Sequence, residues 1–183
     1  MQVRSKYSLE INLAPLRVLV ADESEGARTM MRELLVALGC KDVVTVSALE
    51  NAAGKLQSER FDLCIIDFHL AKDTGPELVK RIRADEKNEN RKIPVLMTCS
   101  RATRKSLGYA RNCGAHMVMT KPFSAEALYD RLAWIAHHPR MFVFLDSYRG
   151  PDRRFHDSYS FGEERRKSQP ADECFEEPMK VAG

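Results

Sequence analysis

Short apolar runs alternate with stretches of helical periodicity between residues 17 and 137. The runs lie at 18–20, 43–44, 63–66, 95–97 and 117–119. Because their apolar residues are consecutive rather than alternating, each run is typical of a strand that is covered on both faces. The pattern therefore predicts five strands inside one buried sheet.

The segments between the runs carry signals for helices. Ser47 with Glu50, and Thr74 with Glu77, fit the spacing of a capping box, and Ser124 is placed to cap a last helix. Strands that alternate with helices predict a parallel sheet with helices on both faces. We expect an α/β fold with a doubly wound (βα)5 parallel sheet.

Two segments lie outside this unit. Residues 1–15 form a short N-terminal lead-in, and residues 16–137 form the α/β domain. Residues 138–183 are rich in glycine and proline and have few apolar residues after Phe144, which predicts a largely irregular, extended C-terminal tail. The apolar run at 141–145 would add one short strand or pack against the last helix.

The overall composition excludes several classes of protein. No apolar run approaches the roughly 18 residues that a membrane span needs, and residues 1–15 show no secretory signal, so we expect a cytoplasmic protein. The net charge of +3 is spread along the chain, and we expect no DNA binding. Five cysteines without a C-x-x-C pair argue against a zinc site or a disulfide framework.

Polar and charged residues follow four of the five runs, at the point where each strand would end. In a doubly wound sheet the carboxyl ends of the strands meet at one edge, where such folds bind ligands. The residues are Asp22 and Glu23 after the first run, Asp67 after the third, Thr98, Cys99 and Ser100 after the fourth, and Lys121 after the fifth.

These residue types suit the binding of a phosphoryl group. Three carboxylates in one cleft repel one another unless a cation is present, and oxygen ligands of this kind suit Mg2+. Lys121 would supply a fixed positive charge for a phosphoryl oxygen, and a hydroxyl from the fourth strand would bond another. The arrangement predicts that Asp67 accepts a phosphoryl group, where catalysis is mostly positioning and charge neutralisation.

The same residues resemble the motifs of response-regulator receiver domains of bacterial two-component systems. Asp22-Glu23, Asp67 and Lys121-Pro122-Phe123 stand where these domains carry their acid pair, their phospho-acceptor and a K-P-F motif. Thr74-Gly75 matches the usual small residue and glycine beyond the acceptor. The resemblance covers about residues 16–137 and is closest in kind to stand-alone, chemotaxis-regulator-like receivers.

The resemblance implies a flavodoxin-like fold and a phosphoprotein rather than an enzyme. Asp67 would be phosphorylated by a histidine kinase or a phosphotransfer protein. Mg2+ would be held by Asp22, Glu23, Asp67 and the backbone carbonyl of His69. The Lys121–Pro122 peptide bond would be cis.

Three positions depart from the family pattern. Glu23 replaces the commoner second aspartate and keeps its charge. Cys99 stands at the position of the switch Thr or Ser, and Thr98 would supply the hydroxyl only if the register differed by one residue. Val118 replaces the switch aromatic residue, so the usual coupling of hydroxyl and ring is absent.

The C-terminal tail leaves the output open. It shows no helix-turn-helix pattern and no catalytic motif, so we expect output by contact with a downstream protein or by phosphorelay. The missing switch pair motivates an alternative, which is a phosphorylation-independent scaffold. The resemblance to chemotaxis-like receivers with Arg-rich tails implies another, which is a receiver that binds a cyclic di-nucleotide. Other interpretations are a solvated tail with balanced charges, or a lid or dimerisation arm. The arginines concerned are Arg153, Arg154, Arg165 and Arg166.

Overall fold

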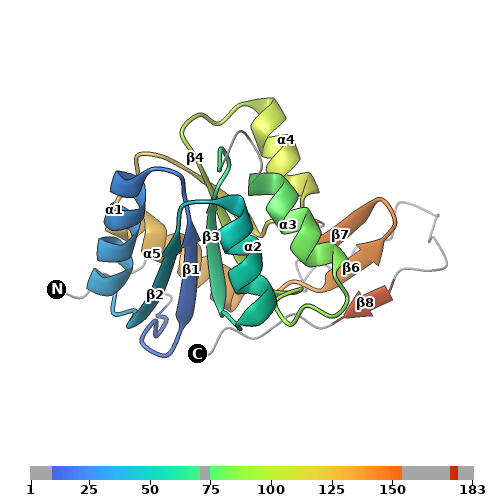
Figure 1. Ribbon diagram of the computed structural model, residues 1–183, viewed down its shortest axis with the longest axis horizontal. Coiled ribbons are helices and arrows are strands. Elements are labelled where there is room, and N and C mark those ends of the chain that lie inside the picture. Colours follow the sequence, from blue (N-terminus) through green and yellow to red (C-terminus); the bar gives the residue numbers. More distant parts are fainter. Residues whose placement is uncertain (1–9, 71–74, 154–173, 177–183) are drawn as a thin grey trace, which may run out of the picture.

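The structure, a computed structural model, describes residues 10–70, 75–153 and 174–176. Its centre is a five-stranded parallel sheet in the order β2-β1-β3-β4-β5 (Figure 1). The strands are β1 (Arg17–Ala21), β2 (Asp42–Val46), β3 (Leu63–Asp67), β4 (Val95–Cys99) and β5 (Met117–Thr120). This confirms the α/β, flavodoxin-like doubly wound sheet that the sequence predicts.

Five helices cover the two faces of the sheet. They are α1 (Glu25–Ala37), α2 (Leu49–Ser58), α3 (Gly75–Ala84), α4 (Arg104–Asn112) and α5 (Ala125–His137). Neighbouring strand residues point to opposite faces, so Cys64 packs in the cluster that contains Leu56 of α2 and Leu78 of α3. Ile65 packs in the cluster that contains Leu35 of α1 and Leu132 of α5. No helix within the described ranges is long and apolar enough to cross a membrane.

The helix starts agree only in part with the predicted caps. The Ser124 side chain accepts a hydrogen bond from Ala127 N and caps α5, as predicted. The capping box at Ser47 is wrong, because α2 begins one residue later, with Ala48 at its N-cap and no side-chain cap. The other predicted capping box contains Thr74, which lies outside the described residues.

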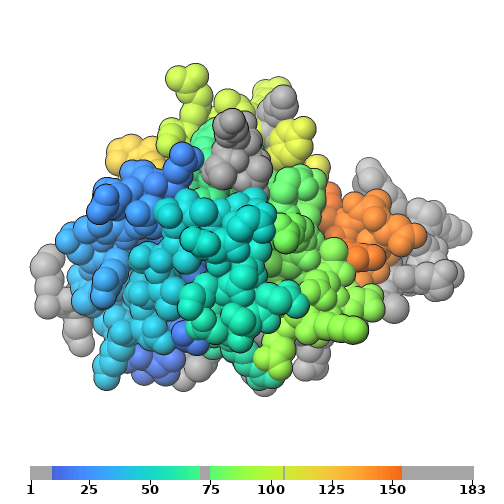
Figure 2. Space-filling view, viewed as in Figure 1, coloured from blue at the N-terminus to red at the C-terminus, as the bar shows by residue number. Residues whose placement is uncertain are grey.

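The segment after α5 has more regular structure than one short strand. Three strands form a separate antiparallel sheet in the order β7-β6-β8. They are β6 (Phe142–Leu145), β7 (Tyr148–Pro151) and β8 (Cys174–Glu176). Only two residues join β6 to β7, so these strands form a tight hairpin, and the hairpin lies against α3 (Figures 1 and 2).

Arg83 of α3 lies at the junction between the hairpin and the α/β domain. Its side chain is fully buried, and its guanidinium donates hydrogen bonds to three backbone carbonyls. The acceptors are Arg91 O at 2.6 Å, Ile93 O at 2.7 Å and Gly114 O at 3.1 Å. Burial lowers the pKa of Arg83 to about 10, so the group is still protonated at neutral pH.

Candidate functional site

Asp22, Asp67 and Lys121 meet at the carboxyl ends of the parallel strands. The Lys121 Nζ donates to Asp67 Oδ1 at 2.6 Å and to Asp22 Oδ2 at 2.6 Å. The three side chains are largely buried, with exposed fractions of 19% for Lys121, 10% for Asp22 and 8% for Asp67. The strand ends thus bring together two of the three predicted carboxylates and the predicted lysine.

The charges at this cluster do not balance. Burial lowers the pKa of Lys121, but the hydrogen bonds and charges of Asp22 and Asp67 outweigh burial, and the net effect is a raised pKa. Lys121 therefore stays protonated at neutral pH. Two carboxylates against one ammonium leave one net negative charge in a largely buried place, which favours the approach of a further cation.

Asp67 has two more hydrogen-bond partners. Its Oδ2 accepts from the backbone N of His69 at 2.8 Å, and its Oδ1 accepts from Thr98 Oγ1 at 3.4 Å. Asp67 pairs with Thr98 across the β3–β4 ladder. Because neighbouring residues of a strand point to opposite faces, this register places the hydroxyl of Thr98, rather than the side chain of Cys99, beside the acceptor.

Cys99 and Val118 pack instead of facing the acceptor. Cys99 is fully buried in the apolar cluster of α2 and α3, and Val118 packs against the same cluster. Burial and the charge of Asp67 raise the pKa of the Cys99 thiol, although Lys121 opposes the shift. Cys99 is therefore a protonated thiol in the core at neutral pH.

The residues fit Mg2+ through fewer side chains than predicted. Within the described ranges, no three Asp, Glu, His or Cys side chains are grouped so that they could hold a metal together, and Glu23 is exposed. Mg2+ nevertheless keeps several waters and takes only one or two protein carboxylates. The carboxylates of Asp22 and Asp67 supply oxygen ligands of that kind.

Two local features hold the site, and of these the sequence pointed only to Gly75. Arg28 of α1 donates from Nη1 to the carbonyls of Asp22 and Glu23, both at 2.9 Å. A Cβ on Gly75 would lie 2.2 Å from the carbonyl oxygen of Asp67, so only glycine allows α3 to begin there. The Lys121–Pro122 bond is cis, as expected.

Of the four predicted tail arginines, Arg153 is the one that lies within the described residues. Arg153 is already engaged, because its Nη1 donates to Asn112 Oδ1 at 2.9 Å and its guanidinium lies 3.6 Å from the centre of the Tyr148 ring. The other three predicted arginines, Arg154, Arg165 and Arg166, lie outside the described residues.

Comparison with known proteins points to one family. A family model described as the response regulator receiver domain matches residues 18–133. Chemotaxis protein CheY of Pseudomonas aeruginosa is 28% identical over 117 residues, which are 64% of this chain and 93% of that protein. The sensory/regulatory protein RpfC of Xanthomonas campestris pv. campestris is 30% identical over 121 residues, which are 66% of this chain but only 16% of RpfC.

Solved structures agree with the sequence comparisons. Chemotaxis response regulator CheY4 of Vibrio cholerae superposes with a TM-score of 0.60 at 29% identity, covering 66% of this chain and 98% of that one. A response regulator structure from Chloroflexus aurantiacus has a TM-score of 0.61 at 23% identity, covering 67% and 98%, and supports the fold alone. The match to CheY4 leaves about a third of this chain uncovered.

Proposed function

This chain belongs to the response regulator receiver domain family, and on that premise we propose that it is a signalling module that accepts a phosphoryl group on Asp67. The observation that carries the proposal is the position of Lys121, whose ammonium lies 2.6 Å from a carboxylate oxygen of Asp67. A phosphoryl oxygen on Asp67 would lie within reach of that charge. The same ammonium holds Asp22 nearby.

The phosphoryl group would come from a phosphohistidine. Receiver domains interact with histidine kinases or phosphotransfer proteins, and with downstream targets. The P–N bond to the donor histidine breaks while a P–O bond forms to Asp67, and the donor keeps the electron pair on its ring nitrogen. Lys121 and the Thr98 hydroxyl, which both donate to Asp67, would stabilise the oxygens of the transferred group.

Receiver domains bind Mg2+ at their acidic phosphorylation site. Here Asp22, Asp67 and the carbonyl of His69 would hold the ion directly, and Glu23 would contribute through a bound water. When bound, the ion would neutralise charge on the phosphoryl oxygens. The protein itself orients the carboxylates, through Arg28 on the backbone of Asp22 and Glu23.

The test uses beryllofluoride, which mimics a phosphoryl group on a carboxylate. We expect a bound 19F NMR signal from the wild-type protein with Mg2+, and none from Asp67→Ala. Asp42→Ala is the matched control, because Asp42 is an exposed carboxylate at the other end of the sheet. If Asp67→Ala bound beryllofluoride as well as the wild type did, the assignment of the site would be wrong.

A second candidate function is a scaffold that acts without phosphorylation. The observation that favours it is the packing of Cys99 and Val118, neither of which provides the hydroxyl or the ring of the usual switch. Activity in cells that survives Asp67→Ala but is lost with Arg153→Ala would favour this second function. Loss of activity with Asp67→Ala would favour the first.

A further inference from the structure

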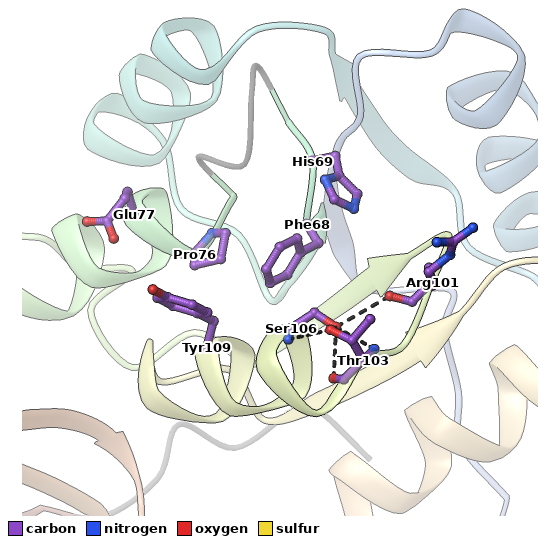
Figure 3. Close-up of a pocket in the computed structure, with 8 residues that line it drawn as sticks. All are labelled: Phe68, His69, Pro76, Glu77, Arg101, Thr103, Ser106 and Tyr109. Carbon is purple, nitrogen blue, oxygen red and sulfur yellow. Dashed lines mark hydrogen bonds between the residues drawn. The ribbon is translucent and has the colours of Figure 1, made fainter.

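A cavity of about 580 Å3 lies next to the end of β3, between the start of α3 and the start of α4 (Figure 3). Sites that bind small molecules are commonly about 300–1,000 Å3 in volume. Phe68 and His69, the two residues that follow Asp67, line one side of the cavity. The lining does not include Asp22, Asp67 or Lys121, and the proposed phosphoryl transfer uses only the backbone carbonyl of His69 from it.

Three flat apolar groups line the cavity. Phe68 is 7% exposed, Pro76 is buried in the first turn of α3, and Tyr109 of α4 keeps 48% of its surface exposed. In Figure 3 the rings of Phe68, Pro76 and Tyr109 border the same space. Aromatic rings prefer stacked or edge-to-face contact with other rings, so this part of the cavity suits a planar apolar body.

The two aliphatic hydroxyls in the lining, those of Thr103 and Ser106, are already committed to the start of α4. Thr103 Oγ1 accepts from Ser106 N at 3.0 Å, and Ser106 Oγ accepts from Thr103 N at 2.8 Å. Thr103 Oγ1 also donates to Ser106 Oγ at 3.1 Å, and Ser106 Oγ donates to Thr103 O at 3.0 Å. Their protons are therefore used, and the hydroxyls offer no donor to an anion.

Two charged side chains line the cavity, and they differ in their partners. Glu77 is paired with Lys80, whose Nζ lies 2.8 Å from Glu77 Oε1. Arg101 lies at the opposite end of the cavity in Figure 3. Its guanidinium forms no hydrogen bond or ion pair with any residue in the described ranges. Arg101 is therefore the group that would receive an anionic part of a ligand.

We propose that this cavity binds a small aromatic carboxylic acid, with its ring between Phe68, Pro76 and Tyr109 and its carboxylate on Arg101. A guanidinium and a carboxylate have matching planar geometry and form two parallel hydrogen bonds. The hydroxyls of Thr103 and Ser106 are not available as further donors, which favours a carboxylate, because one guanidinium can pair with both of its oxygens. This binding goes beyond the proposed phosphoryl transfer and does not require it.

The test uses 2-naphthoate as the probe and 2-naphthamide as its neutral counterpart, with the full chain and without Mg2+. We expect naphthoate to shift the backbone amide NMR signals of Phe68, His69, Ser106 and Tyr109. Arg101→Gln should weaken naphthoate binding about tenfold, because a hydrogen bond to a charged group is lost. The same variant should change naphthamide binding by less than about twofold.

Two further variants test whether binding is specific to this cavity and to the charge of Arg101. Arg104→Gln removes an exposed arginine of α4 that does not line the cavity, so it should leave naphthoate binding unchanged. Tyr109→Ala should weaken both probes, because it removes one wall of the cavity. Shifts that map to other parts of the protein would overturn the proposal. So would equal weakening of naphthoate by Arg101→Gln and Arg104→Gln. Either result leaves the beryllofluoride test of Asp67 unaffected.

Discussion

The guanidinium carbon of Arg83 lies 5.1 Å from the centre of the Phe142 ring, and both side chains are fully buried. The family model matches residues 18–133 and therefore ends before Phe142, so the contact between Arg83 and Phe142 lies partly outside the matched domain. The hairpin of β6 and β7 is therefore packed on the α/β domain. A buried cation of α3, with its hydrogen bonds to three backbone carbonyls, supports that packing.

Arg83→Met should lower the free energy of unfolding by about 3 kcal/mol or more, because three backbone carbonyls lose their donors in a buried place. Arg81→Met is the matched control in the same helix. Its guanidinium makes one exposed ion pair with Glu50 at 3.4 Å, so its loss should cost less than about 1 kcal/mol. Urea unfolding of both variants measures the difference. Equal losses of unfolding free energy in the two variants would show that the buried hydrogen bonds of Arg83 do not stabilise the protein.

Gly75→Ala should destabilise the protein by about 1–3 kcal/mol and weaken beryllofluoride binding, because the new methyl group forces the backbone of Asp67 to move. Gly54→Ala is the matched control. Gly54 lies inside α2 with no atom within 4 Å of the added Cβ, so that change should stabilise by about 0.5–1 kcal/mol. Urea unfolding and 19F NMR test both variants. Unchanged binding by Gly75→Ala would contradict the expected close approach.

Thr98→Val should weaken beryllofluoride binding by about twofold to tenfold, because the variant keeps the shape of the side chain but loses the hydroxyl beside Asp67. Cys99→Ala should change the affinity by less than about twofold, since a thiol is a weak donor. Titration calorimetry with Mg2+ present gives both affinities. A larger effect from Cys99→Ala than from Thr98→Val would show that the fourth strand presents its other face to the acceptor.

Stability should fall as the pH drops below about 6.5, because His116 is held neutral in the folded protein. Burial, with the charges of Arg83 and Arg140, lowers the pKa of His116 well below its usual value. His116 Nδ1 accepts a hydrogen bond from Val95 N at 3.1 Å, and the ring packs 5.6 Å from that of Phe142. The folded state therefore binds fewer protons than the unfolded state in this range, and acid favours unfolding.

The size of that effect has an upper limit of about 1.4 kcal/mol for each pH unit below 6.5, which corresponds to one proton. The measurement is the melting temperature between pH 7.5 and pH 5. His116→Asn keeps an acceptor near the position of Nδ1 but cannot titrate, so its melting temperature should depend less on pH. If the melting temperatures of the wild type and of His116→Asn changed equally with pH, groups other than His116 would cause the acid sensitivity.

Several features could be predicted from the residues alone because they depend on local order along the chain. Consecutive apolar residues such as those at 63–66 mark a strand buried on both faces, and this pattern places Asp67 at a strand end. Since all parallel strands end at the same edge, Asp22 and Lys121 had to lie near it. The meeting of these three residues thus needed no knowledge of side-chain packing.

Other features depended on distances between segments far apart in the chain. The pairing of Asp67 with Thr98 decides which face Cys99 occupies, and a register cannot be read from either strand separately. The hairpin after α5 was missed because Phe142 is buried there against residues far earlier in the chain, among them Arg83, which lies 59 positions before it, and His116. The spacing of apolar residues specified the strands and the edge where the acceptor lies, because both follow from local periodicity. Only tertiary packing decided which hydroxyl faces the acceptor and what covers the end of α3, because each depends on a contact between distant segments.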